Sequence, residues 1–295
     1  MTTQYDTANQ QRNSSGARER LLQSLPVRER RLELAGVETA VLEGGEGPPV
    51  VLLHGPGAYA AHWLRIIPAL VTKHRVIVPD LPGHGASTVI SGALNADRVL
   101  GWLDELLKET CTDRPALVGQ LLGGAIAARF AVEHGDRLRS LTLIDTFGLS
   151  EFRPAPEFAD ALTRFMTEPD PRTHDNLWRY CARDLKRLRD AMGEYWSPFE
   201  QYNVDRARTP SVQRALHALM EAFSGPIPER DLARITAPTA LIWGRYDMAT
   251  ALEVAEAASV RYAWPLHVIE AANDDPPVEQ PEALIRVLAG LIKAS

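Results

Sequence analysis

Short apolar runs and amphipathic segments alternate along most of this 295-residue chain. The apolar runs are typical of parallel strands that are covered on both faces. They lie at residues 50–53, 76–78, 116–118, 141–144 and 240–243, and residues 265–269 predict the last strand. Two segments in which apolar and polar residues alternate, 30–34 and 37–43, predict a hairpin at the edge of the sheet.

Apolar residues recur at helical spacing between these strands. The predicted helices cover residues 96–108, 122–134, 251–262 and 281–293. Because strands and helices alternate, the sequence predicts a doubly wound α/β domain with a mostly parallel sheet and helices on both faces. Ligands of such domains bind beyond the carboxyl ends of the strands, so the loops at that end are where we expect the site.

Residues 148–230 interrupt this alternation. The segment is helical in character, contains several prolines and is rich in aromatic residues, including Trp178 and Trp196. We expect a helical lid with an apolar underside over the strand ends, with most of its aromatic side chains packed in its own core. The α/β core is then expected over residues 26–147 and 231–295, and the polar residues 1–25 are expected to be a disordered extension.

The composition argues against several classes of function. The chain is 45% hydrophobic and 24% charged, as in globular domains, and its net charge of −6 gives no reason to expect nucleic acid or a membrane as partner. Cys111 and Cys181 lie far apart and outside any metal-binding spacing, so we expect no metal and no cofactor. The N-terminus lacks the apolar core of a signal peptide. We expect a cytoplasmic protein and leave open a homodimer.

The segment Leu117–Gly124 has the shape of a nucleophile elbow but lacks the nucleophile. An apolar strand leads into Gly119-Gln120-Leu121-Leu122-Gly123 and then into a helix. In this context the pattern G-x-S-x-G presents a serine on a sharp turn. Leu121 stands at the serine position, and its side chain can neither attack a carbon atom nor exchange a proton.

With other motifs in the expected order, the chain resembles the α/β-hydrolase superfamily over roughly residues 30 to 295. The motifs are the elbow, His54-Gly55-Pro56-Gly57, Asp80–Ser87, Trp243–Asp247 and Asp275–Glu282. The resemblance implies the α/β-hydrolase fold, with an eight-stranded sheet, and a triad of nucleophile, histidine and acid. At the three triad positions this chain has Leu121, Asp274 and Asp247, so only the acid is retained.

The oxyanion site of the superfamily is altered as well. One donor is often the backbone N–H that follows the His-Gly pair, where this chain has Pro56, which lacks an N–H. Gly57 could take its place, and the amide of Leu122 can still be the second donor. His54 lies on the same loop, where a structural role is the common one. We therefore expect the Ser-His-Asp route to be closed.

Carboxylates near the strand ends remain as candidate chemical groups. We expect Asp247, Asp274 and Asp145 to converge beside Leu121, where shared burial would raise their pKa values and leave one of them protonated at neutral pH. The alternative is that these aspartates only accept hydrogen bonds from loop amides. The first functional hypothesis is an atypical enzyme in which Asp247 and Asp274 carry acid–base chemistry of the lyase, cyclase or water-addition type.

Two other hypotheses stay open. Leu121 makes the floor of the expected pocket apolar, which suits a catalytically silent protein that binds a small hydrophobic molecule. The third hypothesis is an interaction role of the lid. The residues expected to bind the small hydrophobic molecule are Gln120, Leu121, Leu122, His54, Gly57, Asp145, Trp178 and Trp196.

Overall fold

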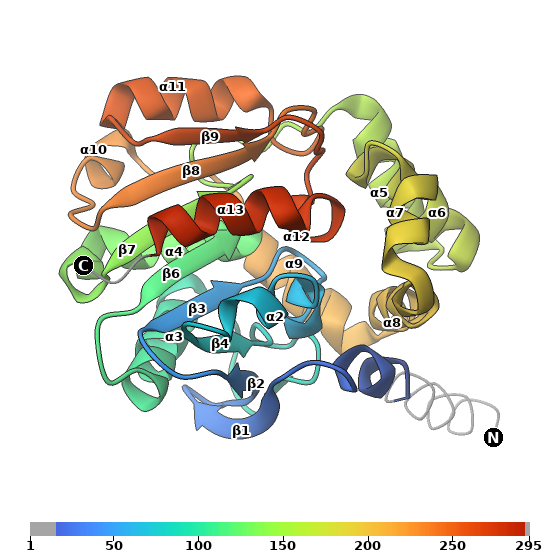
Figure 1. Ribbon diagram of the computed structural model, residues 1–295, viewed down its shortest axis with the longest axis horizontal. Coiled ribbons are helices and arrows are strands. Elements are labelled where there is room, and N and C mark those ends of the chain that lie inside the picture. The colour runs from blue at the N-terminus through green and yellow to red at the C-terminus, as the bar shows by residue number, and fades with distance from the viewer. Residues whose placement is uncertain (1–15, 293–295) are drawn as a thin grey trace.

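A β-sheet forms the centre of the computed structural model, which describes residues 16–292 (Figure 1). Its strands are β1 (Arg28–Leu34), β2 (Val37–Gly44), β3 (Pro49–Leu53), β4 (Arg75–Pro79), β5 (Thr88–Val89), β6 (Ala116–Gln120), β7 (Ser140–Ile144), β8 (Thr239–Gly244) and β9 (Leu266–Ile269). The order is β1-β2-β4-β3-β6-β7-β8-β9, and β5 pairs with β2. All neighbouring pairs along the path from β4 through β3, β6, β7 and β8 to β9 are parallel. Strand β2 is antiparallel to each of its neighbours, β1, β4 and β5. The expected mostly parallel eight-stranded sheet is confirmed, with the short β5 in addition.

The β1–β2 hairpin has a turn that suits the twist of its strands. Leu34 pairs with Val37 across the turn residues Ala35 and Gly36. These two residues have φ angles of 45° and 71°. Positive φ at both central positions is the mark of a type I′ turn, the common connection of two-residue hairpins.

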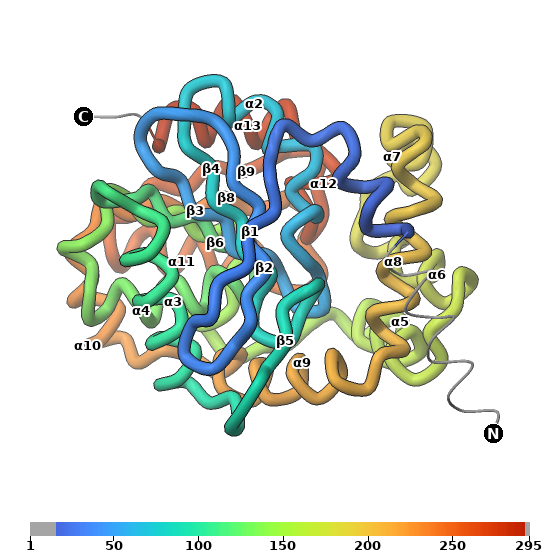
Figure 2. The backbone as a smooth tube through the Cα atoms, turned by 90° about the horizontal axis from the view of Figure 1, so that it is seen from below, coloured from blue at the N-terminus to red at the C-terminus, as the bar shows by residue number. Residues whose placement is uncertain are grey.

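Helices cover both faces of the sheet (Figure 2). One face packs against η1 (Ala60–Trp63), α2 (Ile67–Leu70) and α13 (Pro281–Leu291), and the other against α3 (Ala96–Thr110), α4 (Leu122–His134) and α11 (Leu252–Tyr262). The ranges of α3, α4, α11 and α13 agree with the four predicted helices to within a few residues. The short elements η2 (Gly135–Arg137), α10 (Glu229–Leu232) and α12 (Pro276–Glu279) complete the core. Among residues 16–292, no helix has the length and apolar character needed to cross a bilayer.

A group of helices that follows β7 lies mostly beyond one end of the sheet, and its last helix returns to pack against α4 (Figure 1). We call it the α5–α9 segment; it comprises α5 (Pro156–Thr167), α6 (Pro171–Cys181), α7 (Leu185–Met192), η3 (Gly193–Tyr195), α8 (Trp196–Arg208) and α9 (Pro210–Phe223). Trp178 packs edge-on against Phe199 and Trp196, with ring centroids 5.0 and 5.9 Å apart. This aromatic cluster forms an internal core for the segment.

The N-terminal region differs from the expected disorder of residues 1–25. Residues 16–22 form a helix in which Ala17 and Leu21 are fully buried. Arg18 of this helix pairs with Asp80 and Glu29. A buried leucine and a paired arginine give these residues enough contacts to be ordered. Residues 1–15 lie outside the described residues.

Glycines allow the elbow strand, the elbow helix and β3 to approach one another closely. A Cβ atom at Gly119 would lie 2.4 Å from the carbonyl oxygen of Gly123. A Cβ atom at Gly123 would lie 2.5 Å from the carbonyl oxygen of Leu53. Both separations are far below van der Waals contact, so larger residues would push α4 away from the sheet.

Alanine substitutions at two helical glycines test this packing. Gly123→Ala is expected to lower the free energy of unfolding by about 2 kcal/mol, because its methyl group meets backbone atoms that cannot rotate away. Gly101 in α3 has open space around it, so Gly101→Ala is expected to raise the free energy of unfolding by about 0.5–1 kcal/mol. Urea unfolding of both variants measures the difference. Equal effects at the two positions would contradict the close packing of α4.

Candidate active site

The turn between β6 and α4 keeps the strained geometry of a nucleophile elbow although it carries leucine. Leu121 has φ 46° and ψ −110°, a conformation that costs a residue with a side chain roughly 1–3 kcal/mol. Its N–H donates to the carbonyl of Ile144 at 2.9 Å, and its own carbonyl accepts from Ala125 and Phe147. These bonds hold the turn in place, and the Leu121 side chain occupies the position of the nucleophile.

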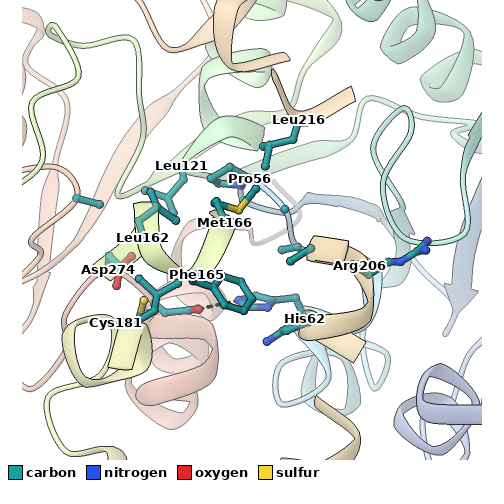
Figure 3. A pocket seen from close by; sticks show the side chains of 18 of the residues that line it. Pro56, His62, Leu121, Leu162, Phe165, Met166, Cys181, Arg206, Leu216 and Asp274 are labelled. Atoms are coloured by element: carbon teal, nitrogen blue, oxygen red, sulfur yellow. Dashed lines mark hydrogen bonds and ion pairs between the residues drawn. The ribbon is translucent and has the colours of Figure 1, made fainter. Parts of the chain in front are cut away.

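An apolar cavity of about 220 Å³ lies between the elbow and the α5–α9 segment. Leu121 borders it together with Pro56, Leu162 and Met166 (Figure 3). Further lining side chains are mostly aliphatic or aromatic, among them Phe158, Phe165, Leu177 and Leu216. Such a lining favours a small molecule whose larger part is apolar.

Several predicted site residues line this cavity. They are Gln120, Leu121, Gly57, Trp178 and Asp274. The others do not line it. They are His54, Leu122, Asp145, Asp247 and Trp196.

His54 has a structural place beside the cavity. Its Nδ1–H donates to the carbonyl of Gly55, and its Nε2 accepts from the backbone N–H of Leu81 at 3.0 Å. Burial lowers the pKa of His54 well below its usual value, so the imidazole is neutral. Both ring nitrogens are occupied, and the side chain connects the β3 loop to the β4 loop.

The three predicted carboxylates lie in one poorly hydrated region but have different partners. Asp145 accepts from the N–H of Gly244 at 2.8 Å. Asp247 accepts from the amides of Ala249 and Thr250 at 2.7 and 2.9 Å. Burial raises the pKa of Asp247 to about 6. Loop amides thus hold Asp145 and Asp247.

Asp274 is the predicted carboxylate that faces the cavity. Burial, followed by the negative charges of Asp247 and Asp275, raises its pKa well above the usual value. Its Oδ1 atom is buried without a hydrogen-bond partner. Cys181 lies beside it (Figure 3), and burial raises the pKa of that thiol well above its usual value. Both groups therefore favour their protonated, uncharged forms.

A histidine–aspartate pair at the same cavity was missed by the sequence analysis. His62, on η1, places its Nε2 atom 2.8 and 2.9 Å from the two carboxylate oxygens of Asp275. Gln120 donates from Nε2 to Asp275 Oδ1 at 3.2 Å and to the backbone carbonyl of Asp274 at 3.1 Å. His62 and Asp275 are 213 positions apart in the chain. The one feature of the sequence that pointed to this pair was a second acidic residue, Asp275, directly after Asp274.

One further cluster has the composition of a metal site. His174, Asp175 and Glu200 of the α5–α9 segment bring possible ligand atoms within 4.8 Å of one another. Arg189 forms ion pairs with both carboxylates, and its positive charge disfavours a metal cation beside them. Burial lowers the pKa of His174 to about 3. The cluster is explained as an ion-pair group beside a neutral histidine.

Several known proteins with similar sequences or structures are named as hydrolases. The sequence profile of the family described as alpha/beta hydrolase fold matches residues 48–259. The chain is 28% identical over 256 residues to a pimeloyl-[acyl-carrier protein] methyl ester esterase of Aeromonas hydrophila, which covers 83% of this chain and 95% of that protein. It is 32% identical over 222 residues to a 2-hydroxy-6-oxo-6-phenylhexa-2,4-dienoate hydrolase of Comamonas testosteroni, which covers 70% of this chain and 73% of that protein. The solved structure of a hydrolase with the same name from Rhodococcus sp. strain RHA1 has a TM-score of 0.79, 24% identity, and coverage of 92% of this chain and 100% of its own, which supports the fold.

These relatives correct the functions expected from the sequence. Because the relatives are named as hydrolases, the expected lyase, cyclase or water-addition chemistry of paired carboxylates is wrong, and so is the alternative of a catalytically silent ligand-binding protein. The structure adds a physical reason: Asp247 is bound by its own loop, whereas Asp274 lines the cavity. The relatives place the chain in the hydrolase class.

The variant Asp274→Asn tests the burial of this carboxyl group. A carboxyl whose pKa is raised by folding holds a proton that the unfolded chain releases above about pH 4, so the free energy of unfolding falls as the pH rises through the folded-state pKa. Asparagine keeps the shape without this titration. The variant is expected to be more stable than the wild type by about 1–3 kcal/mol at pH 8, and by less at pH 5, in urea unfolding.

The exposed Asp160 on α5 provides the matched control. Asp160→Asn is expected to change the free energy of unfolding by less than about 0.5 kcal/mol at either pH. If the free energy of unfolding of Asp274→Asn is not raised at pH 8, or is raised equally at both pH values, Asp274 is not a carboxyl with a raised pKa.

Proposed function

We propose that this chain, which belongs to the α/β-hydrolase fold family, hydrolyses a small, mainly apolar carboxylic ester without forming an acyl-serine intermediate. The observation that carries the proposal is the combination of a strained elbow at Leu121 with an apolar cavity directly beside it. The fold, the cavity and the relatives support hydrolysis, whereas the residue at the elbow excludes the usual nucleophile.

No hydroxyl or thiolate side chain of the described cavity residues supplies that nucleophile. Among the described residues that line the cavity, none is serine or threonine. Cys181 lines it, but burial keeps its thiol protonated, and the thiol is a far weaker nucleophile than the thiolate. Water is then the group that attacks the carbonyl carbon in the proposed reaction.

The amino end of α4 supports this reaction at the carbonyl oxygen. The first N–H groups of a helix have no partners within the helix and carry partial positive charge. Leu122 is the first residue of α4 and follows Leu121 directly. Leu122 does not itself line the cavity, but its N–H adjoins Leu121, which does, and it is the proposed donor to the oxyanion that forms when water adds to the carbonyl.

Two substrate types follow from the relatives. The Aeromonas relative is named as a methyl ester esterase, which agrees with an ester. The Comamonas relative is named as a hydrolase of a dienoate that bears a phenyl and an oxo group, and the aromatic side chains of the cavity favour such a ring as a second candidate. Both reactions begin with attack on a carbonyl carbon.

Ester turnover and active-site labelling test the proposal together. The wild-type protein is expected to hydrolyse p-nitrophenyl hexanoate above the rate of heat-denatured protein, and a fluorophosphonate probe is expected to leave its mass unchanged. A 2-hydroxy-6-oxo-6-phenylhexa-2,4-dienoate assay covers the second candidate. No turnover of either compound would overturn the proposed function, and labelling of any serine would overturn its serine-free route.

Restoring the missing side chains tests the geometry of the elbow. The double variant Leu121→Ser/Asp274→His places a nucleophile and a base at the triad positions, where Asp247 remains as the acid. It is expected to react with the fluorophosphonate, because the elbow is already strained and Ser and His act as a unit.

Each single variant is a control for the double variant. Leu121→Ser alone and Asp274→His alone are expected to react with the fluorophosphonate at least about 100-fold more slowly than the double variant, since each lacks either the base or the nucleophile. A double variant that folds, as judged by its thermal unfolding curve, yet labels no faster than Leu121→Ser would show that positions 121 and 274 do not face each other as in the family.

A further inference from the structure

We propose that His62 is the general base that activates the attacking water, and that Asp275 is the positioning residue that holds the His62 imidazole for this task. The inference rests on the proposed hydrolase function and adds the group that performs it. It begins from the observation that His62, Asp275 and Leu121 all border the same cavity.

The contacts of His62 determine which ring nitrogen is available. Nε2 lies within hydrogen-bond distance of both oxygens of Asp275, at 2.8 and 2.9 Å. A carboxylate only accepts hydrogen bonds, so Nε2 carries the proton and donates it. In a neutral imidazole the other nitrogen, Nδ1, then has a free lone pair. Nδ1 is buried and has no hydrogen-bond partner.

Packing fixes the imidazole of His62 in this orientation. The ring of Tyr59 meets it edge-on at 6.3 Å between centroids, and the ring of Phe199 lies at 5.8 Å. Only 6% of His62 is exposed. A base that is held before the substrate arrives needs little reorganisation during the reaction.

Gln120 holds the Asp275 carboxylate in place and provides a second buried atom without a hydrogen-bond partner. Its Nε2 donates to Asp275 Oδ1, and this hydrogen bond keeps the carboxylate in position next to the His62 imidazole. Its Oε1 is buried without a partner, as is Nδ1 of His62. Both residues line the cavity. Buried polar atoms without a protein partner are the atoms that a water molecule normally satisfies, so each of these two atoms is an acceptor available to a water in the cavity.

Asp274 is the competing base at this cavity. Burial and the charges of Asp247 and Asp275 favour its protonated form, and a protonated carboxyl has no strong basic site. Nδ1 of His62 is an unpartnered nitrogen whose lone pair is free when Nε2 donates to Asp275. The hydrogen-bond geometry therefore favours His62 over Asp274 as the base.

The reaction then balances without any other reagent. Nδ1 of His62 takes a proton from water while the water oxygen bonds to the ester carbonyl carbon, and the carbonyl electron pair moves onto its oxygen, which accepts from the N–H of Leu122. When this pair returns, the bond from carbon to the alcohol oxygen breaks. The imidazolium of His62 gives its proton to that oxygen. The products are the acid and the alcohol, and His62 is neutral again.

The decisive measurement is the turnover of p-nitrophenyl hexanoate by His62→Gln, Asp275→Asn and the control His217→Gln. His62→Gln is expected to lower kcat at least about 100-fold, with KM changed less than about three-fold, because a general base acts in the transition state. Asp275→Asn is expected to lower kcat at least about ten-fold. His217 is exposed on α9, and its variant is expected to keep wild-type turnover.

Chemical rescue separates a catalytic role from a structural one. His62→Gly is expected to regain at least about ten-fold in kcat when imidazole is added, because free imidazole can occupy the space beside Asp275. The same addition is expected to leave His62→Gly/Asp275→Asn unchanged, since that variant lacks the carboxylate that would hold the imidazole. Rescue of both variants to the same extent would overturn the positioning role of Asp275.

The outcomes distinguish this inference from the proposed function. A wild-type protein that turns over the ester while folded His62→Gln does so equally well overturns the inference alone. A wild-type protein without turnover of the ester or the dienoate overturns both. Should the His62 variants fail to fold, diethyl pyrocarbonate treatment of the wild type decides. Loss of turnover in step with modification of His62, prevented by hexanoate, supports the inference, and full modification of His62 without loss of turnover overturns it.

Discussion

The burial of several carboxylic acids in one apolar region is the constraint on which the rest of this site depends. Asp145, Asp247, Asp274 and Asp275 all lie in loops at the carboxyl ends of strands, and each is less than 10% exposed. An ionised carboxylate is stable in such a region only where donors or a counter-charge replace water. Loop amides donate to Asp145 and Asp247, although burial still raises the pKa of both, and an imidazole and an amide side chain contact Asp275. Asp274 and Asp145 each keep an unpartnered oxygen, and burial together with the neighbouring charges makes the cavity-facing Asp274 favour the neutral form.

The elbow shows that scaffold geometry and chemistry are separable in this fold. The turn at Leu121 keeps a positive φ because glycines 119 and 123 bring β6, α4 and β3 into backbone contact, and any residue between them must adopt the turn. The strain is then a property of the packing and does not require a nucleophile. What changes with leucine is the lining: an apolar side chain replaces a hydroxyl at the end of the cavity that adjoins α4.

The sequence was sufficient for the architecture and insufficient for the site. Local patterns predicted α4 at residues 122–134 and the β1–β2 hairpin because helical periodicity and turn residues act over a few positions. The helix at residues 16–22 was missed because its stability comes from tertiary contacts such as the Arg18–Asp80 pair. The His62–Asp275 pair was missed for the same reason, since 213 positions separate its members. Placing His54 among the binding residues followed its motif, whereas the fold uses both of its ring nitrogens between loops.

In the proposed reaction, the arrangement of acid and base around the cavity suits water better than a protein nucleophile. In the family triad the histidine comes from the loop after the last strand and faces the residue at the elbow. Here that loop carries Asp275, and the imidazole comes from η1, which follows β3. A base in this new place no longer needs to contact position 121, and a water molecule can occupy the space between the base and a bound carbonyl group. Leucine at the elbow is compatible with the proposed reaction because its side chain offers water no hydrogen bond, whereas Nδ1 of His62 and Oε1 of Gln120 are buried without a protein partner.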